Sequence, residues 1–422
     1  MLQAYYKGKQ SSYTGISAIP VSKCGYIIIL AFVYYLLFAP IAYLPDRSII
    51  KYGMILIVGL FVLYNIKVIL QKKYLSMNIL LLLFVVVCFI SSIINRNTIS
   101  SRDPFLASIV YMGTLVEALL VFEILAEKEG FSFIINILYR LTIFTVIITD
   151  FLIFFVPTLF SIYGHNYLVG TKFGVAYLHV QLIVLLFLRR TTKLYKTNFF
   201  YVLTVLYSAL AVFISIYVDC MTGVMLTAIF LLVYFIFYRI RRALANPVLI
   251  VVVLLIFCVM LLINSTIMEN EYVQNFIINI LERSPTMTGR TRIFEHISYI
   301  MAGHWALGYG YGSAYEITME LIGAPNVQNG LLNWCLECGI FAAILIIAML
   351  FNSFRKVKYC DKELYPVVVI LYSFCIIASI EVCISGQFFT WMFFVFVYST
   401  YTCHLNYKDY KTKFIKKRCY DG

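Results

Sequence analysis

Two arginines in the second half of the sequence, Arg290 and Arg292, could bind an anion. Thr288 is a suitable N-cap, so a helix can begin there. Such a helix carries one apolar stripe, formed by Ile293, Phe294, Ile297, Ile300 and Met301. At about 100° per residue Arg290 falls on that stripe, whereas Arg292 falls opposite it, with Glu295 as a surface partner. Arg290 therefore points to the apolar side, where a cation is costly unless an anion meets it.

A glycine-rich segment at 303–312 follows, with glycines at the alternate positions 308, 310 and 312. Glycines let a backbone approach a ligand closely and leave amides exposed to oxygen atoms. Tyr309 and Tyr311 offer flat faces and hydroxyls that suit sugars, and His304 could donate a hydrogen bond at the same level. An equally good interpretation is a tight turn at a lipid interface, where tyrosine and tryptophan are favoured in any case.

Three side-chain amides, Asn326, Gln328 and Asn329, precede an apolar run that begins at Gly330. They could hydrogen-bond a polyol, or they could cap the helix that follows, as asparagine often does. Gln328 cannot take a proton, so a general base at that position is excluded.

The elements that position these residues are membrane helices, because 62% of the 422 residues are hydrophobic and 13% are charged. A soluble globular protein carries about a quarter charged residues, so that class is excluded. The net charge of +13 is better explained by topology determinants beside anionic lipid than by nucleic-acid binding. Cys335 and Cys338 form one CxxC spacing inside an apolar run, which favours small hydrophobic side chains over a metal or redox site.

Twelve apolar windows qualify, or nearly qualify, as membrane spans of about 20 residues. They are 25–44, 49–66, 74–94, 105–126, 132–156, 173–188, 199–218, 221–238, 247–264, 330–351, 365–385 and 387–404. If the N-terminus is cytoplasmic, 24 of the 33 Lys and Arg residues fall on the inside and eight on the outside. This bias predicts an even number of spans with both termini in the cytoplasm.

The sequence therefore predicts an all-α polytopic membrane protein with four parts. Nine spans occupy 1–264, a large extracytoplasmic loop 265–329, three spans 330–404, and a basic cytoplasmic tail 405–422. The loop is also expected to hold an amphipathic surface helix, because apolar residues recur in it at helical spacing. These are Val273, Phe276, Ile277, Ile280 and Leu281.

Other charged residues on the predicted outer side could take part in chemistry. Lys172 is a second candidate cation, or a lysine whose amine reaches the lipid headgroups. Asp219, at the mouth of a helical hairpin, is a candidate base. Glu337 could orient a substrate or pair with a buried cation such as Arg140. Four carboxylates within spans are expected to pair between helices, namely Glu117, Glu123, Asp150 and Glu381. The histidines show no ligand spacing, so we expect no metal.

Several of these residues together resemble the signature loop of the O-antigen ligase and polymerase superfamily. They are Thr288-Gly289-Arg290 with Phe294, Gly308-Tyr309-Gly310, Asn329 with Leu331 and Leu332, and Glu337 with Gly339. The resemblance covers roughly 50 residues. It implies a fold related to C-type glycosyltransferases and a polytopic enzyme of the bacterial plasma membrane that needs no cofactor. Its substrates would be polyprenyl-pyrophosphate-linked oligosaccharides, and a chain-length regulator and a flippase would be its partners.

The chemistry implied is transfer of a growing glycan from polyprenyl pyrophosphate to a hydroxyl of the next lipid-linked repeat unit. We expect catalytic roles for Arg290, Asp219 and Glu337. Substrate contacts are expected from Lys172, His304, Tyr309, Tyr311, Gln328, Asn329 and Arg292. The family commonly has His-Asn where this chain has Gln328-Asn329, and it often has a Ser-Arg pair where this chain has Asp219 to Gly223 without arginine. The missing arginine weakens the ligase interpretation more than the polymerase interpretation. A ligase of the same superfamily and a lipid-linked oligosaccharide flippase remain the alternatives.

Overall fold

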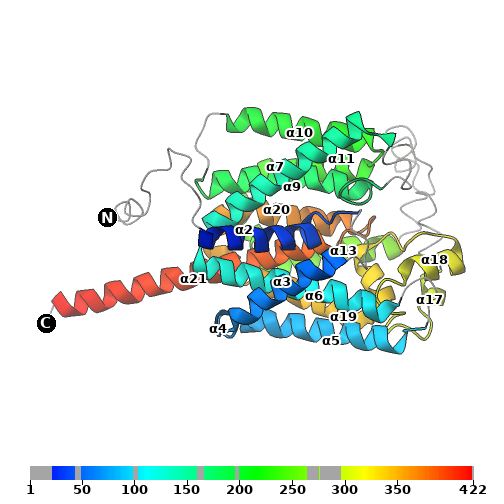
Figure 1. Ribbon diagram of the computed structural model, residues 1–422, viewed down its shortest axis with the longest axis horizontal. Coiled ribbons are helices and arrows are strands. Elements are labelled where there is room, and N and C mark those ends of the chain that lie inside the picture. The colour runs from blue at the N-terminus through cyan, green and yellow to red at the C-terminus, as the bar shows by residue number, and fades with distance from the viewer. Residues whose placement is uncertain are drawn as a thin grey trace.

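The protein is a bundle of α-helices (Figure 1). The computed structural model describes residues 21–42, 49–97, 103–158, 166–194, 199–263, 275 and 296–420. Within those ranges there are helices, turns and one isolated bridge between Tyr167 and Gly170, and no β-strand. The predicted all-α class is confirmed for the described chain.

Each of the twelve predicted windows overlaps one of the longer helices. These helices are α2 (Val21–Val33), α3 (Ile49–Tyr64), α5 (Leu75–Ile94), α6 (Pro104–Lys128), α7 (Phe131–Phe155), α9 (Lys172–Thr191), α10 (Phe200–Tyr217), α11 (Met221–Ile236), α13 (Pro247–Ile263), α19 (Gly330–Phe354), α20 (Asp361–Ile377) and α21 (Gly386–Tyr420). Shorter helical elements are η1 (Tyr34–Phe38), a π-helical turn, and α4 (Ile66–Ile69), η2 (Phe237–Ile240), α12 (Arg241–Leu244), α17 (Ile297–Ile300), α18 (Ala314–Ile322) and η4 (Val357–Tyr359).

Seven helices in the described part are long and apolar enough to cross a bilayer. They are α5, α6, α7, α9, α10, α11 with its continuation to Leu244, and α19 with its continuation to Tyr359. Three apolar helical stretches are shorter, at Lys23–Phe38, Ile49–Tyr64 and Pro247–Val259. This is the composition of a multi-pass membrane protein, and the count of twelve spans stays a prediction.

Basic residues lie in the last turns of α6, α9 and η2 at one end of the bundle, namely Lys128, Arg189, Arg190 and Arg239. At the same end Lys23 pairs with Glu129 at 3.1 Å, and Arg241 pairs with Asp361 at 2.8 Å. The glycine-rich segment lies with α17 and α18 at the opposite end, on the right of Figure 1. We call these the basic end and the loop end. The first residues of α2 and the last residues of α21 both lie toward the basic end.

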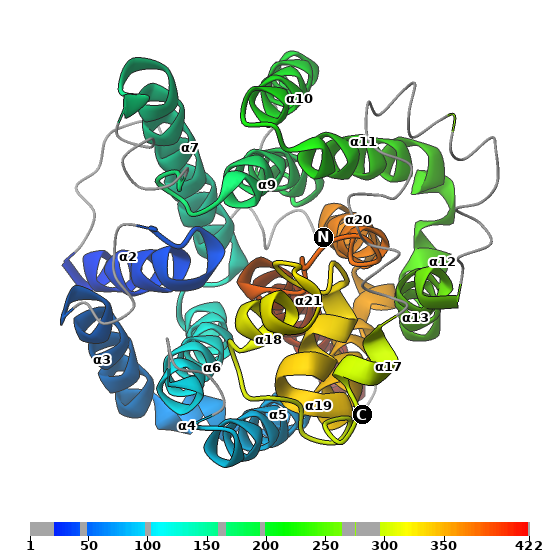
Figure 2. The ribbon, with the colours of Figure 1, turned by 90° about the vertical axis from the view of Figure 1, so that its right-hand side faces the viewer.

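Helix α9 is the most enclosed of the seven, with 78% of its apolar window buried. It packs against α7, α10, α11 and α20 (Figure 2). Its buried His179 lies with Nε2 3.1 Å from Asp150 Oδ1 of α7, which confirms the predicted interhelical pairing of Asp150. Glu123 accepts from Asn78 Nδ2 at 3.4 Å, whereas Oε2 of the buried Glu117 has no hydrogen-bond partner among the described residues.

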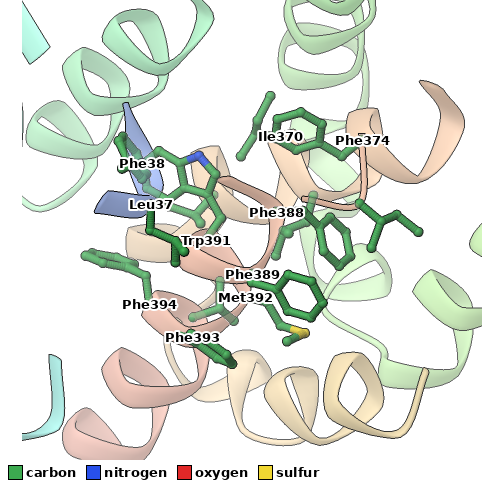
Figure 3. Packing of buried hydrophobic residues seen from close by; sticks show 14 of the residues in the cluster. Leu37, Phe38, Ile370, Phe374, Phe388, Phe389, Trp391, Met392, Phe393 and Phe394 are labelled. Carbon is green, nitrogen blue, oxygen red and sulfur yellow. The ribbon is translucent and has the colours of Figure 1, made fainter. Parts of the chain in front are cut away.

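Besides α19, whose helical backbone is interrupted at Gly339, two predicted spans are interrupted near the loop end. The window 25–44 changes to the π-helical turn η1, and α20 stops at Ile377, eight residues before the expected limit. Residues 378–385 are then irregular before α21 begins. Both interruptions adjoin a dense aromatic core, in which the rings of Phe38 and Trp391 lie 5.0 Å apart (Figure 3).

The interruptions persist because other helices satisfy their carbonyl groups. The Phe38 carbonyl accepts from Gln181 Nε2 at 3.3 Å and from Gln387 Nε2 at 3.0 Å. In the irregular segment, the Ile384 carbonyl accepts from Trp334 Nε1 at 2.8 Å. Non-helical backbone at membrane depth is tolerated where it is buried in protein or lines a cavity.

Candidate functional site

A cavity of about 480 Å³ lies where the interrupted helices meet at the loop end. Its walls come from η1 and Pro40, from the starts of α3, α6, α9 and α21, and from Tyr311 of the glycine-rich segment. This volume falls in the range of about 300–1,000 Å³ that is typical of small-molecule sites.

The cavity combines apolar walls with a set of groups that can hydrogen-bond. The apolar part includes Leu36, Leu37, Val110, Val169 and Phe173. The polar groups are Lys51, Tyr111, Thr114, Thr171, Tyr177, Tyr311, Ser385 and Gln387. A largely apolar pocket with convergent polar groups is the usual form of a ligand site.

Two of the polar lining residues are nearly enclosed and keep unused hydrogen-bonding atoms. Tyr177 is 5% exposed and Gln387 is 7% exposed. The Tyr177 hydroxyl and Gln387 Oε1 have no protein partner in the described part of the chain. Both atoms have less than 1 Å² of accessible surface, so they are buried within the wall and are not open to the cavity.

The glycine-rich segment is docked on α19 through its backbone. Tyr309 N donates to the Leu336 carbonyl at 2.8 Å, and Gly310 N donates to the Glu337 carbonyl at 2.8 Å. Tyr311 N donates to Ser92 Oγ at 3.1 Å. The expectation that these amides bind substrate oxygens is therefore wrong, because their donors are bonded to protein.

Glycine at 339 makes this docking possible. It has φ 81° and ψ 175°, which interrupts the helical backbone within α19. A Cβ atom on Gly339 would lie 1.9 Å from the Ala306 carbonyl oxygen. Gly339 and the glycines of segment 303–312 thus allow the backbone of that segment to approach the backbone of α19.

Tyr311 is the residue of that segment that reaches the cavity. Its ring stacks on Tyr111, with centroids 5.0 Å apart and planes inclined by 17°. Tyr309 and His304 instead stack on each other at 3.8 Å, and the Tyr309 hydroxyl donates to the Ile300 carbonyl. Partial burial, with a contribution from Tyr299, raises the pKa of Tyr309, so its hydroxyl stays a neutral donor. Tyr309 and His304 do not line the cavity.

The structure brings together two other predicted residues, Lys172 and Asp219. Lys172 Nζ donates to the Asp219 carbonyl at 2.8 Å and lies 3.3 Å from Asp219 Oδ2. Asp219 has φ 54°, and its side chain is 72% exposed. Lys172 is the first residue of α9 and adjoins the cavity wall formed by Thr171 and Phe173. The pair therefore lies beside the cavity.

Asn329 caps α19, which is one of the two roles that the sequence suggested for it. Its Oδ1 accepts from Leu332 N at 3.0 Å, and its Nδ2 donates to the Cys258 carbonyl at 3.0 Å. The side chain is fully buried, so it is not placed to bind a polyol. Gln328 is half-buried with φ 52°, and its amide N donates to Asn326 Oδ1 at 2.8 Å.

Glu337 is buried in α19 just before the interruption at Gly339 and interacts electrostatically with Tyr111, a cavity residue. Its suggested pairing with Arg140 as a buried cation is wrong, because Arg140 is exposed on α7. Arg290 and Arg292, with most of the two helices expected at 273–301, lie outside the described residues. Of the predicted apolar stripe, the described residues Ile300 and Met301 are buried and Ile297 is partly exposed.

Sequence reasoning missed Lys51, Tyr111, Tyr177 and Gln387 as parts of one site. A weak signal existed for Gln387, which is a polar residue at the start of a strongly apolar window. Tyr111 and Tyr177 had no such signal, since tyrosine is common in membrane helices. Their convergence depends on how four separate helices start at the same end of the bundle.

No protein-family model, no curated protein and no solved structure matches this chain. Among the residues that the structure describes, no three His, Cys, Asp or Glu side chains gather as a metal-binding group would.

Proposed function

We propose that this protein is a membrane glycosyltransferase that polymerises lipid-linked oligosaccharide repeat units into a surface polysaccharide. Its substrate would be an oligosaccharide on polyprenyl pyrophosphate, used on the outer side of a bacterial plasma membrane. The observation that carries the proposal is the cavity at the loop end, into which the segment resembling the superfamily contributes Tyr311. Apolar walls there suit an isoprenoid, and the adjoining polar groups suit a glycan.

The orientation of the proposal follows from charge. Helices α6, α9 and η2 have basic residues in their last turns, at the end of the bundle away from the cavity, and the positive-inside rule favours a cytoplasmic location for that end. The start of α2 and the end of α21 both lie at that end, which supports cytoplasmic termini. A cavity at the loop end then faces the outer leaflet, where lipid-linked repeat units would be joined.

The proposed reaction requires little covalent chemistry from the protein. Pyrophosphate is a good leaving group, so catalysis consists of neutralising its developing charge and aligning the acceptor hydroxyl. Arginine suits the first task because its planar donors grip two oxygens and stay charged. We assign that role to Arg290, with Asp219 and Glu337 as the carboxylates that could accept the hydroxyl proton.

A carrier is the second candidate function. Helices interrupted beside a central cavity are typical of secondary transporters, and η1 and residues 378–385 interrupt two helices here. A flippase for the same lipid-linked oligosaccharide would use the same cavity. A ligase would transfer finished polymer from the same carrier to a different acceptor.

One reconstitution separates these functions. Purified protein in liposomes receives a single type of lipid-linked repeat unit, and the products are resolved by size. A polymerase yields a ladder, a ligase requires a second acceptor, and a flippase changes only the sidedness of the lipid. Absence of a ladder from correctly inserted protein with several repeat units would refute the polymerase.

Paired arginine variants test the assigned cation. Arg290→Ala should abolish polymer while leaving membrane insertion normal, whereas Arg292→Ala should be much milder, because we expect it to face solvent. Equal loss in both variants would contradict the helix-face argument.

A further inference from the structure

A second cavity, of about 450 Å³, opens on the outside of the bundle along the second half of α19. Its apolar walls are Leu80 of α5, Val251 of α13, and Ile344, Ile347, Ala348 and Phe351 of α19. α19 lies between α5 and α13 and packs against both (Figure 2). We call this cavity the lateral groove.

The lateral groove is open to whatever surrounds the bundle. Ile344 is 53% exposed and Phe351 is 40% exposed, and Leu80 and Val251 at its two sides are half-buried. In a membrane such surfaces meet lipid chains, which are as apolar as leucine. A ligand of the groove must therefore be a hydrocarbon over most of its length.

One end of the lateral groove is polar. It is formed by Arg355 and by Asn352, whose Nδ2 donates to Ser76 Oγ at 3.2 Å. Arg355 directly follows α19 and is exposed. In the described part of the chain no carboxylate pairs with Arg355, and no acidic residue lines the groove. The positive charge of Arg355 is thus available to an anion.

The neighbouring charged groups do not neutralise Arg355. Asp361, the nearest carboxylate along the chain, pairs with Arg241 at 2.8 Å. Lys356 donates to Thr400 Oγ1 at 3.4 Å, and its charge repels that of Arg355. An anion beside Arg355 would offset this repulsion.

The length of the lateral groove matches one leaflet of a bilayer. Its lining on α19 runs from Ile344 to Arg355, which at 1.5 Å per residue is about 16 Å. One leaflet contributes about 15 Å to a hydrocarbon core of about 30 Å. Arg355 lies at the basic end, because α19 ends there shortly before Asp361 and its partner Arg241. A lipid whose headgroup meets Arg355 would therefore lay its chain along the groove to about the middle of the bilayer.

We propose that the lateral groove binds an anionic glycerophospholipid of the leaflet at the basic end. Its phosphate meets Arg355, and one acyl chain lies along α19 toward Ile344. Arginine suits the phosphate because its planar donors grip two oxygens, and basic pockets between membrane helices on the cytoplasmic side bind anionic headgroups. The site goes beyond the proposed function and does not rest on it, since it lies at the end of the bundle away from the loop-end cavity.

Native mass spectrometry of the full-length protein in detergent tests this site. Phosphatidylglycerol and phosphatidylcholine with the same acyl chains are titrated separately, and the apparent Kd of the first bound lipid is measured for each. We expect phosphatidylglycerol to bind about fivefold more tightly, because one cation beside an anionic lipid contributes about 1 kcal/mol. Equal apparent Kd values for the two lipids would overturn the proposal.

A pair of arginine variants locates the preference in the groove. Arg355→Gln should raise the apparent Kd for phosphatidylglycerol to about that for phosphatidylcholine. Arg239→Gln is the matched control, because Arg239 is an exposed arginine at the same end, lies outside the groove and pairs with no described carboxylate. This control should keep the preference. Equal loss of the preference in both variants would overturn the proposal, since the preference would then come from the overall surface charge.

Filling the groove tests the place of the acyl chain. Ala348→Phe should weaken binding of both lipids, because its ring would occupy the lateral groove. Ala209→Phe is the control, since Ala209 is exposed on α10 and does not line the groove. Unchanged binding in a correctly inserted Ala348→Phe variant would overturn the proposed place of the chain.

A third lipid tests the identity of the occupant. Farnesyl phosphate offers a phosphate on an isoprenoid instead of a diacylglycerol. Weaker binding of farnesyl phosphate than of phosphatidylglycerol would support the phospholipid. Tighter binding of farnesyl phosphate, lost in Arg355→Gln, would overturn the phospholipid in favour of an isoprenoid.

Discussion

Replacing Gly339 by alanine should strongly destabilise the protein. The backbone at this position has φ 81° and ψ 175°, a region that is essentially restricted to glycine, and holding alanine there costs about 1–3 kcal/mol. The added Cβ would also lie 1.9 Å from the Ala306 carbonyl oxygen, so backbone must move. Three backbone hydrogen bonds join α19 to the glycine-rich segment, from Tyr309, Gly310 and Ile340. At about 0.5–1.5 kcal/mol each, their loss brings the expected total to about 2.5–7.5 kcal/mol.

Reversible unfolding of the purified protein in mixed detergent micelles would measure this change. Gly113→Ala is the matched control, because Gly113 lies in α6 and nothing lies within 4 Å of its added Cβ. That control should be neutral or more stable by up to about 1 kcal/mol, since alanine favours the helix. A free energy of unfolding for Gly339→Ala within about 0.5 kcal/mol of the unaltered protein would refute the proposed docking of the glycine-rich segment on α19.

Three further variants or probes test other contacts. Asn329→Ala should lower the free energy of unfolding by about 0.5–2 kcal/mol, because the cap on Leu332 N is lost; an unchanged value would contradict the capping role. Glu117→Gln should leave the free energy of unfolding unchanged or raise it by up to about 2 kcal/mol, because Oε2 of the buried carboxyl has no partner among the described residues. A clear fall in the free energy of unfolding would instead show that the charge of Glu117 is essential. Burial raises the pKa of Cys220 to about 11, so maleimide at pH 8 should label Cys220 far more slowly than the exposed Cys24. Labelling of Cys220, measured by mass spectrometry, should accelerate as the pH rises toward 11. Comparable labelling rates of the two cysteines at pH 8 would contradict the burial of Cys220.

Much of the helical framework could be predicted from the sequence. Twelve apolar windows became twelve helices, because a backbone in hydrocarbon must satisfy its own hydrogen bonds and a helix does so locally. The cap at Asn329 could also be anticipated, since a capping side chain bonds to amides two or three residues away.

The interruptions of two helices could not be predicted, and they shape the cavity. η1 ends where it does because Gln181 and Gln387, which are far away in the sequence, bond to the Phe38 carbonyl. Residues 378–385 stay irregular because Trp334 bonds to the Ile384 carbonyl. An apolar run of sequence contains no sign of these distant partners.

The alternating glycines show the same division between sequence and structure. Their sequence indicated either a close approach of backbone to a ligand or a tight turn at a lipid interface. In the tertiary structure this backbone hydrogen-bonds to the carbonyl groups of Leu336 and Glu337 in α19. Tertiary structure also decided which side chains share the cavity, because Lys51, Tyr177 and Gln387 meet only when the starts of α3, α9 and α21 are packed at one end. Local hydrogen bonding and hydropathy fix the helices of this protein, whereas its candidate site depends on contacts between helices.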